Sequence, residues 1–166
     1  MHQGPTERHI DEQTYRKVVG RFATGVAVVT TRLGGVDYAM TVNSFTSVSL
    51  DPLLVLFCAE KLARFHDAVM ESGVWGVSVL PASMQEASRF FARRGRPIDG
   101  QVARWPHYRG ELGVALFQDA LATLEATTTA VHPGGDHSIV VGAVHSLGTP
   151  SDGVPLMYHD GDYKTL

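Results

Sequence analysis

The sequence has little cysteine, no long apolar run and no excess of basic residues. Its one cysteine, Cys58, excludes an intramolecular disulfide, and its place in the apolar run 53–58 predicts a small buried side chain. No apolar segment approaches the roughly 20 residues that span a bilayer, and the first residues lack the apolar core of a signal peptide. We therefore expect no membrane association and a cytoplasmic location. With 14 basic and 17 acidic residues and a net charge of −3, nothing favours a nucleic acid as partner.

Familiar cofactor and catalytic motifs are also missing. Neither G-x-G-x-x-G nor G-x-x-x-x-G-K-[ST] occurs, which excludes a standard Rossmann dinucleotide site and a P-loop. There is no C-x-x-C, H-x-H or H-E-x-x-H arrangement, so the eight histidines show no standard spacing of metal ligands. No G-x-S-x-G elbow suggests a hydrolase. Only non-standard ligand sites remain open.

The composition that is present indicates a folded domain. Hydrophobic residues make up 44% and charged residues 19% of 166 positions. We expect a flexible tail at residues 1–9 and one domain at residues 10–166. Apolar residues at helical spacing predict helices from Asp11 to before Gly25, over 61–71, and from a Ser83–Glu86 capping box to about Arg93.

The rest of the chain is organised as strands. We predict them over residues 26–31, 36–43, 53–58, 74–80, 120–131 and 138–147, with a short edge strand at 155–158. The run 53–58 is continuously apolar, which predicts a central strand buried on both faces. Residues 95–113 contain four glycines and two prolines and predict a surface loop. Most of the six or seven strands follow one another without a helical crossover. This order predicts a mainly β fold, an antiparallel β-barrel with peripheral helices.

Hydroxyl side chains are concentrated in residues 39–52, between two apolar strands. The stretch holds three serines, two threonines and Asn43. A backbone that wraps a phosphate-bearing ligand uses such groups as donors and acceptors. The same residues favour turns for local reasons, so a Ser/Thr-rich hairpin connection is the alternative interpretation.

Two further features allow two interpretations each. Residues 89–96 contain four arginines, which either complement the dipole at the end of a helix or reach a phosphate. The run Gly134-Gly135-Asp136-His137 is either an ordinary hairpin connection or a turn that places His137 at the mouth of the barrel. In the second case the glycines let a ligand approach closely.

Together and in this order, these features resemble the short-chain flavin reductases, the reductase components of two-component flavin-dependent monooxygenases. The matching segments are residues 22–26, 28–31, 41–52, 54–58, 71–73, 75–80, 88–90, 135–137, 155–158 and 161–163. The resemblance covers nearly everything from Tyr15 onward. It implies an FMN-binding split barrel, a Greek-key-like antiparallel fold, that forms a homodimer and binds FMN or FAD together with NADH or NADPH.

The resemblance also implies which residues form the site. By matching position, the flavin contacts are Thr41, Val42, Asn43, Ser44, Phe45, Ser47, Val48, Leu62, Ala63, Arg64, Phe90 and Arg94. Ala63 and Phe65 lack hydroxyls that many relatives carry at the phosphate side, and Lys61, Arg64 or an arginine of 89–94 would compensate electrostatically. The nicotinamide turn is implied to be Gly135, Asp136 and His137, with Tyr163 closing the same site.

The implied reaction is direct hydride transfer from the nicotinamide to the flavin, with His137 contacting NAD(P)H. Reduced flavin then leaves for a separate monooxygenase. No basic residue is committed to a 2′-phosphate, which favours NADH. Two alternatives stay open: a split-barrel flavin-binding protein without steady NAD(P)H turnover, such as a sensor or storage module, and a structural domain with a serine-rich turn.

Overall fold

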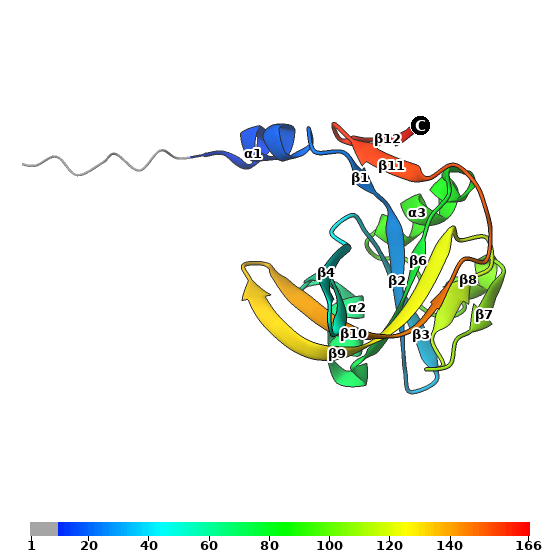
Figure 1. Ribbon diagram of the computed structural model, residues 1–166. Helices are drawn as coiled ribbons and strands as arrows, with labels where there is room; N and C mark the ends of the chain where they lie inside the picture. The colour runs from blue at the N-terminus through cyan, green and yellow to red at the C-terminus, as the bar shows by residue number, and fades with distance from the viewer. Residues whose placement is uncertain (1–9) are drawn as a thin grey trace, which may run out of the picture.

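The computed structural model describes residues 10–166 (Figure 1), and the predicted tail at 1–9 lies outside the described residues. Over that range the chain forms the helices α1 (Glu12–Val19), α2 (Arg64–Ser72) and α3 (Gln85–Ala92), and the short 3-10 helices η1 (Ala82–Met84) and η2 (Val102–Arg104). The strands are β1 (Thr24–Gly25), β2 (Ala27–Leu33), β3 (Val36–Val42), β4 (Thr46–Leu50), β5 (Leu53–Glu60), β6 (Val74–Val79), β7 (His107–Arg109), β8 (Ala115–Phe117), β9 (Ala122–Gly134), β10 (His137–Gly148), β11 (Leu156–His159) and β12 (Asp162–Thr165).

A seven-stranded antiparallel sheet forms the body of the protein, in the order β3-β2-β6-β9-β10-β5-β4. The long β9–β10 hairpin curves along it (Figure 1) and contains two irregularities in register. Strands β1, β11 and β12 form a second sheet, and β7 pairs with β8. The predicted mainly β fold, an antiparallel split barrel with peripheral helices, is confirmed.

The predicted number of strands, six or seven, was too low, because the described residues form twelve. The five strands that the sequence did not indicate are short: β1 has two residues, β7 and β8 have three each, β12 has four and β4 has five. Segments of this length give too few positions to display an alternating pattern. The predicted loop at 95–113 is therefore wrong in part, since it contains η2 and β7.

Strand β2 separates two hydrophobic clusters. Val28 belongs to the first cluster, together with Phe91 of α3 and Phe117. Val29 belongs to the second, which includes Phe57 and aromatic and aliphatic residues of β6 and α2. Because successive side chains of a strand point to opposite faces, β2 is buried on both.

The prediction that residues 53–58 form a central, doubly buried strand is wrong. Strand β5 lies beside the edge strand β4, and its side chains alternate between buried and partly exposed. Only the face that carries Val55, Phe57 and Ala59 packs into the second cluster. Cys58 lies on the other face and is only partly buried, so the predicted burial of its thiol is also wrong.

Two helix starts differ from the prediction. Ser83 falls inside the 3-10 helix η1, and α3 begins only at Gln85, without a side-chain cap. The prediction of a capping box formed by Ser83 and Glu86 is therefore wrong. Helix α2 begins at Arg64 rather than Lys61, because the backbone N–H of Lys61 donates to the carbonyl of Asp136 at 2.9 Å. It ends at Ser72, within one residue of the predicted end at 71, and Gly73 follows in left-handed conformation with φ 66°.

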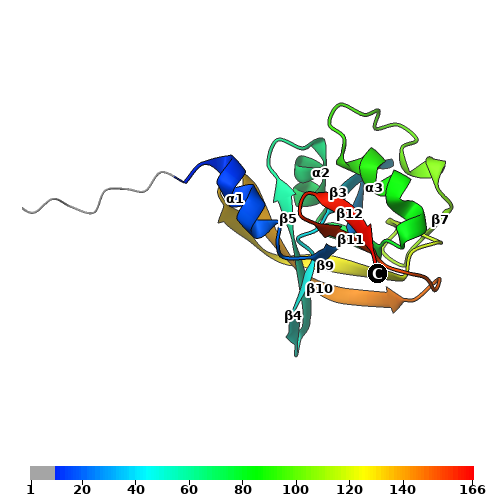
Figure 2. The ribbon, with the colours of Figure 1, turned by 90° about the horizontal axis from the view of Figure 1, so that it is seen from above.

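Helix α1 begins as predicted, with the Asp11 carboxylate accepting a hydrogen bond from the N–H of Thr14 at 2.8 Å. It ends at Val19, before the predicted end, and its apolar stripe is not buried: Tyr15 and Val18 are 61% and 67% exposed. Phe22, just beyond the helix, is 77% exposed. The helix stands out from the body of the sheet in both views (Figures 1 and 2). Between residues 10 and 166, no helix combines the length and the apolarity that crossing a bilayer requires.

Candidate functional site

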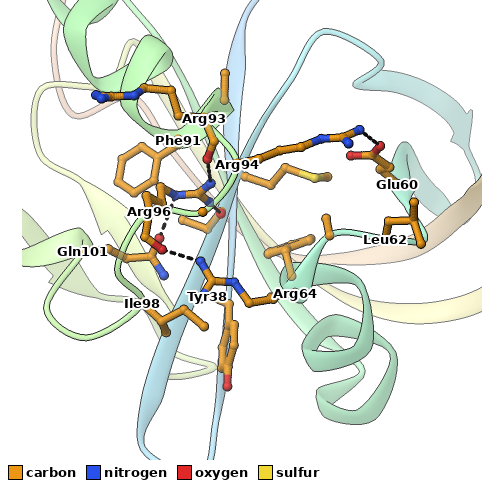
Figure 3. Close-up of a pocket in the computed structure, with 16 residues that line it drawn as sticks. Tyr38, Glu60, Leu62, Arg64, Phe91, Arg93, Arg94, Arg96, Ile98 and Gln101 are labelled. Carbon is orange, nitrogen blue, oxygen red and sulfur yellow. Dashed lines mark hydrogen bonds and ion pairs between the residues drawn. The ribbon is translucent and has the colours of Figure 1, made fainter.

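A pocket with a volume of about 150 Å³ opens beside strand β3, which is an edge strand of the main sheet (Figure 3). It lies between β3, the start of α2 and the segment that follows α3. Its lining residues are Tyr38, Ala39, Met40, Glu60, Leu62, Ala63, Arg64, Phe65, Phe91, Ala92, Arg93, Arg94, Gly95, Arg96, Ile98 and Gln101.

The segment after α3 is held to the edge of β3 by side-chain donors. Arg96 donates to the carbonyls of Ala39 and Arg93, and its Nε donates to Oε1 of Gln101 at 3.1 Å. Nε2 of Gln101 donates to the carbonyl of Asp37 at 2.9 Å. Carbonyls that an edge strand leaves unpaired are satisfied in this way, and the arginine-rich segment is fixed over the pocket.

The pocket is strongly cationic, because it has four arginines, Arg64, Arg93, Arg94 and Arg96, and one carboxylate, Glu60. Arg94 forms an ion pair with Glu60, and Arg64 donates to the backbone carbonyl of Arg96 (Figure 3). Burial of the Arg96 guanidinium is the main cause that holds its pKa below the ordinary value, and the positive charge of Arg64 lowers this pKa further. An anion bound among these groups would favour their charged forms.

Helix α2 adds a second source of positive potential. It begins at the pocket, and its N-cap residue, Ala63, offers no side-chain cap. The first N–H groups of a helix have no intrahelical partner, and together with the helix dipole they attract phosphate. The absent hydroxyls at Ala63 and Phe65 therefore leave N–H groups and arginines as the donors of a phosphate site.

The predicted nicotinamide turn closes the β9–β10 hairpin, with Gly135 at φ 69°. Nδ1 of His137 lies 2.8 Å from the carboxylate of Asp136, and this hydrogen bond holds the pKa of Asp136 below its ordinary value. The hydrogen bond fixes the ring. Within residues 10–166, Nε2 of His137 has no hydrogen-bond partner, so it is available to a ligand.

The end of β5 joins this turn to the arginine pocket. Glu60, which pairs with Arg94, lies opposite His137 in the β5–β10 register. The next residue, Lys61, donates from its backbone to the carbonyl of Asp136 and from Nζ to the carbonyl of Gly135 at 2.6 Å. The Lys61 ammonium, expected at a phosphate, thus binds the hairpin turn.

We expect the substitution Lys61→Met to raise KM for NADH about fivefold and to leave KM for FMN unchanged, since one hydrogen bond that holds the turn is lost. Steady-state kinetics with each substrate varied in turn measure the KM for NADH and the KM for FMN separately. Lys164→Met, which removes an exposed lysine on β12, is the control. An increase in KM for FMN alone would instead assign Lys61 to the phosphate.

The first predicted flavin segment is anchored by its own hydroxyls. Thr41 donates to the carbonyl of Ser88 at 2.7 Å, and the Ser44 hydroxyl accepts from the N–H of Cys58 at 2.9 Å. Phe45 packs against the second cluster, and the side chain of Asn43 is exposed. The hydroxyl-rich stretch therefore contributes to the fold, and these residues stay predicted flavin contacts.

The other predicted site residues fall into three groups. Leu62, Ala63, Arg64 and Arg94 line the pocket. Val42 is buried, and Ser47 and Val48 lie on β4. Ser47 pairs with Val55 of β5. At about 3.3 Å per residue, Val55 is roughly 17 Å along the strand from Glu60 at the pocket. The structure thus does not bring Ser47 and Val48 to the pocket.

The remaining two predicted residues contact α3 or belong to it. Phe90 faces a groove beside the pocket. The Tyr163 hydroxyl lies 2.7 Å from that of Ser88, whose carbonyl accepts from Thr41, so Tyr163 is tied to the flavin segment. No contact places it at the His137 turn among the described residues.

Only four lining residues of the pocket were predicted site residues, and those that were missed include Met40, Glu60, Arg96 and Gln101. Arg96 belongs to the four-arginine run, which was the only local signal. The others reach the pocket through contacts between distant segments. Within residues 10–166, no group of three or more His, Cys, Asp or Glu side chains is arranged to hold a metal ion.

The split barrel thus places a cationic pocket at a helix N-terminus and joins it to a histidine turn, an arrangement suited to a phosphate-bearing ligand. The model of the flavin reductase like domain matches residues 19–166. The reductase subunit HsaB of a flavin-dependent monooxygenase from Mycobacterium tuberculosis (strain CDC 1551 / Oshkosh) is 38% identical over 159 residues, which are 95% of this chain and 83% of HsaB.

Two solved structures are similar over nearly the whole chain. BorF, the flavin reductase component of a bacterial two-component tryptophan halogenase, superposes with a TM-score of 0.88 at 41% identity, over 94% of this chain and 98% of BorF. The NADH:FAD oxidoreductase SgcE6 of Streptomyces globisporus C-1027, in complex with NAD and FAD fragments, superposes with a TM-score of 0.86 at 36% identity. The match covers 93% of this chain and 92% of SgcE6. The chain belongs to the flavin reductase family.

Proposed function

We propose that this protein is an NADH-dependent flavin reductase that reduces FMN or FAD and supplies the reduced flavin to a separate monooxygenase. The observation that carries the proposal is the junction at Glu60 and Lys61, which ties a cationic phosphate pocket to the turn of His137. A reductase must bind a flavin and a nicotinamide side by side, and these two segments are neighbours in the fold. The family membership of the chain supports the same activity.

The residues present fit a flavin nucleotide. Arg64, Arg94 and Arg96, with the N–H groups at the start of α2, would hold its phosphate. Residues 41–45 would lie along the ring system, with their main-chain N–H groups as donors. The bound flavin supplies the chemistry, which is acceptance of a hydride from the nicotinamide.

The chain itself needs little acid–base machinery for this reaction. His137 would donate or accept at Nε2 to hold the nicotinamide nucleotide, while Asp136 fixes its ring. Lys61 keeps the turn in place. Orientation of two bound substrates in reactive geometry and exclusion of water are then the main contributions of the protein.

The requirement for flavin tests the proposal. Purified protein should oxidise NADH, followed by loss of absorbance at about 340 nm, only when FMN or FAD is added. Binding of flavin without oxidation of NADH or NADPH would favour a sensor or storage module. Failure of both flavins to raise the melting temperature would favour a structural domain.

We further propose that the domain spans residues 10–166 and forms a homodimer through α1. Tyr15 and Val18 expose the apolar face of α1, which stands out from the sheet (Figure 2), and Phe22 is exposed just beyond the end of the helix. A second copy of the chain would bury all three side chains. HsaB and BorF are reductase components of two-component systems, which supports a transient partnership through released flavin. We place the reaction in the cytoplasm, where NADH is available.

The homodimer predicts that Val18→Ser combined with Phe22→Ser shifts the protein from dimer to monomer at micromolar concentration, because about 1.5–3 kcal/mol per large apolar side chain is lost from the interface. Size-exclusion chromatography with light scattering measures the mass. Leu147→Ser, on an exposed position of β10, is the matched control. A wild-type protein that is already monomeric would contradict the proposal.

A further inference from the structure

A groove adjoins the arginine pocket on the side of α3. Its volume is about 610 Å³, and its lining residues are Phe90, Arg93, Arg94, Gly95, Arg96, Pro97, Asp99, Gly100, Gln101 and Arg104. Five of these, Arg93, Arg94, Gly95, Arg96 and Gln101, also line the pocket. Pocket and groove are therefore continuous through the arginine-rich segment.

The groove has cationic groups that the fold leaves free. Its four arginines face one carboxylate, Asp99. Within residues 10–166, the side chain of Arg93 forms no hydrogen bond and no ion pair, and it is exposed. A flexible, exposed guanidinium without a partner can reorient toward a phosphate at little cost.

Arg104 adds a flat surface to the groove. Its guanidinium carbon lies 4.5 Å from the centre of the Phe90 ring, and Phe90 in turn packs on Trp105 with ring centres 5.3 Å apart. A guanidinium that lies over an aromatic ring leaves its outer face open, and a nucleobase can stack on that face. The groove thus combines free charge with a stacking platform, which are the two features that an adenylate group needs.

We propose that this groove binds the adenylate half of FAD, so that FAD is preferred over FMN. The inference rests on the proposed function, because it takes the adjoining pocket as the site of the flavin phosphate. In FAD the second phosphate is joined to the first through one bridging oxygen, so it must lie directly beside the pocket. The groove begins there, with Arg93 at the boundary and Arg104 beyond it.

The 2′-phosphate of NADPH is a competing ligand for the groove, but it fits this position less well than the adenylate of FAD. The 2′-phosphate of NADPH belongs to the nicotinamide substrate, whose turn at Gly134–His137 contributes no residue to pocket or groove. The turn is joined to the pocket from the opposite side, through Glu60 and Lys61. The adenylate of FAD is therefore the ligand that the position of the groove favours.

Equilibrium binding tests the inference without turnover. The dissociation constants of FAD and FMN, measured by quenching of flavin fluorescence, should differ about tenfold in favour of FAD for the wild type. Arg104→Gln should raise the dissociation constant of FAD about tenfold and leave that of FMN unchanged. Arg104→Lys should give an intermediate increase for FAD, because lysine keeps the positive charge but lacks the planar guanidinium. Arg32→Gln, on the exposed end of β2, is the control.

The inference is overturned if FMN binds as tightly as FAD, or if Arg104→Gln weakens both flavins equally. It is also overturned if the substitution raises KM for NADPH and leaves the binding of FAD unchanged. Failure of the proposed function would be seen separately, as flavin binding without oxidation of NADH. A tenfold selectivity for FAD in such a protein would still support the adenylate groove.

Discussion

Replacing His137 with alanine is expected to raise KM for NADH about tenfold and to change KM for FMN by less than about twofold, since loss of one hydrogen bond costs about 1.4 kcal/mol. The reason is the position of the ring. Its Nδ1 is held by Asp136 at 2.8 Å, and its Nε2 is turned to no protein group within residues 10–166. Steady-state kinetics with NADH varied at saturating flavin measure the effect.

His132→Ala is the matched control for this prediction. His132 lies in β9 of the same hairpin, is exposed and pairs in register with Ile139. Loss of the His132 side chain should leave the KM for NADH and the KM for FMN unchanged. An intact KM for NADH in the His137 variant would show that this turn does not bind the nicotinamide nucleotide. A fall in melting temperature for His137→Ala alone would identify a structural role of the ring.

The substitution Arg94→Gln is expected to raise KM for FMN by about 10- to 100-fold, because a charge-assisted hydrogen bond contributes about 1.5–3 kcal/mol. In the structure Arg94 pairs with Glu60 across the pocket. A bound phosphate would compete with Glu60 for the guanidinium. Riboflavin has no phosphate, so its KM should stay the same in this variant.

The comparison of riboflavin with FMN separates two explanations of any loss. If Arg94 only supports the local fold, both flavins should weaken together, and this result would contradict a phosphate contact. Arg32→Gln removes an exposed arginine whose side chain, within residues 10–166, donates a hydrogen bond only to the carbonyl of Gly35, and serves as the control. Circular dichroism of each variant confirms that the sheet is intact.

Much of the fold could be predicted because its signals are local. Strands β2 and β3 form where the sequence predicted strands at 26–31 and 36–43, and the Gly34-Gly35 turn, with φ of 57° and 82°, joins them. Gly73 ends α2 in left-handed conformation. Antiparallel pairing followed from strands that succeed one another without crossovers.

Burial could not be predicted with the same success, because it depends on the neighbours of an element. The continuously apolar β5 packs on one face only, beside edge strand β4, whereas β2 has a cluster on each side. The apolar stripe of α1 is exposed in a single chain. Periodicity finds an apolar face, but it does not say what covers that face.

The candidate site shows the same division. The arginine run and the Gly-Asp-His turn were visible in the sequence, whereas their junction at Glu60 and Lys61 depends on the pairing of β5 with β10. Arg96 and Gln101 reach the edge of β3 across more than 55 positions of the chain. Contacts of this range leave no local pattern in the sequence.

Anaerobic reduction of the flavin tests the central claim most directly. Protein mixed with FAD and then with NADH, in the absence of oxygen, should lose flavin absorbance at about 450 nm in step with loss of NADH at about 340 nm, one flavin for each NADH. The His137→Ala variant should need more NADH for the same rate. A flavin that binds and stays oxidised under these conditions would contradict the claim.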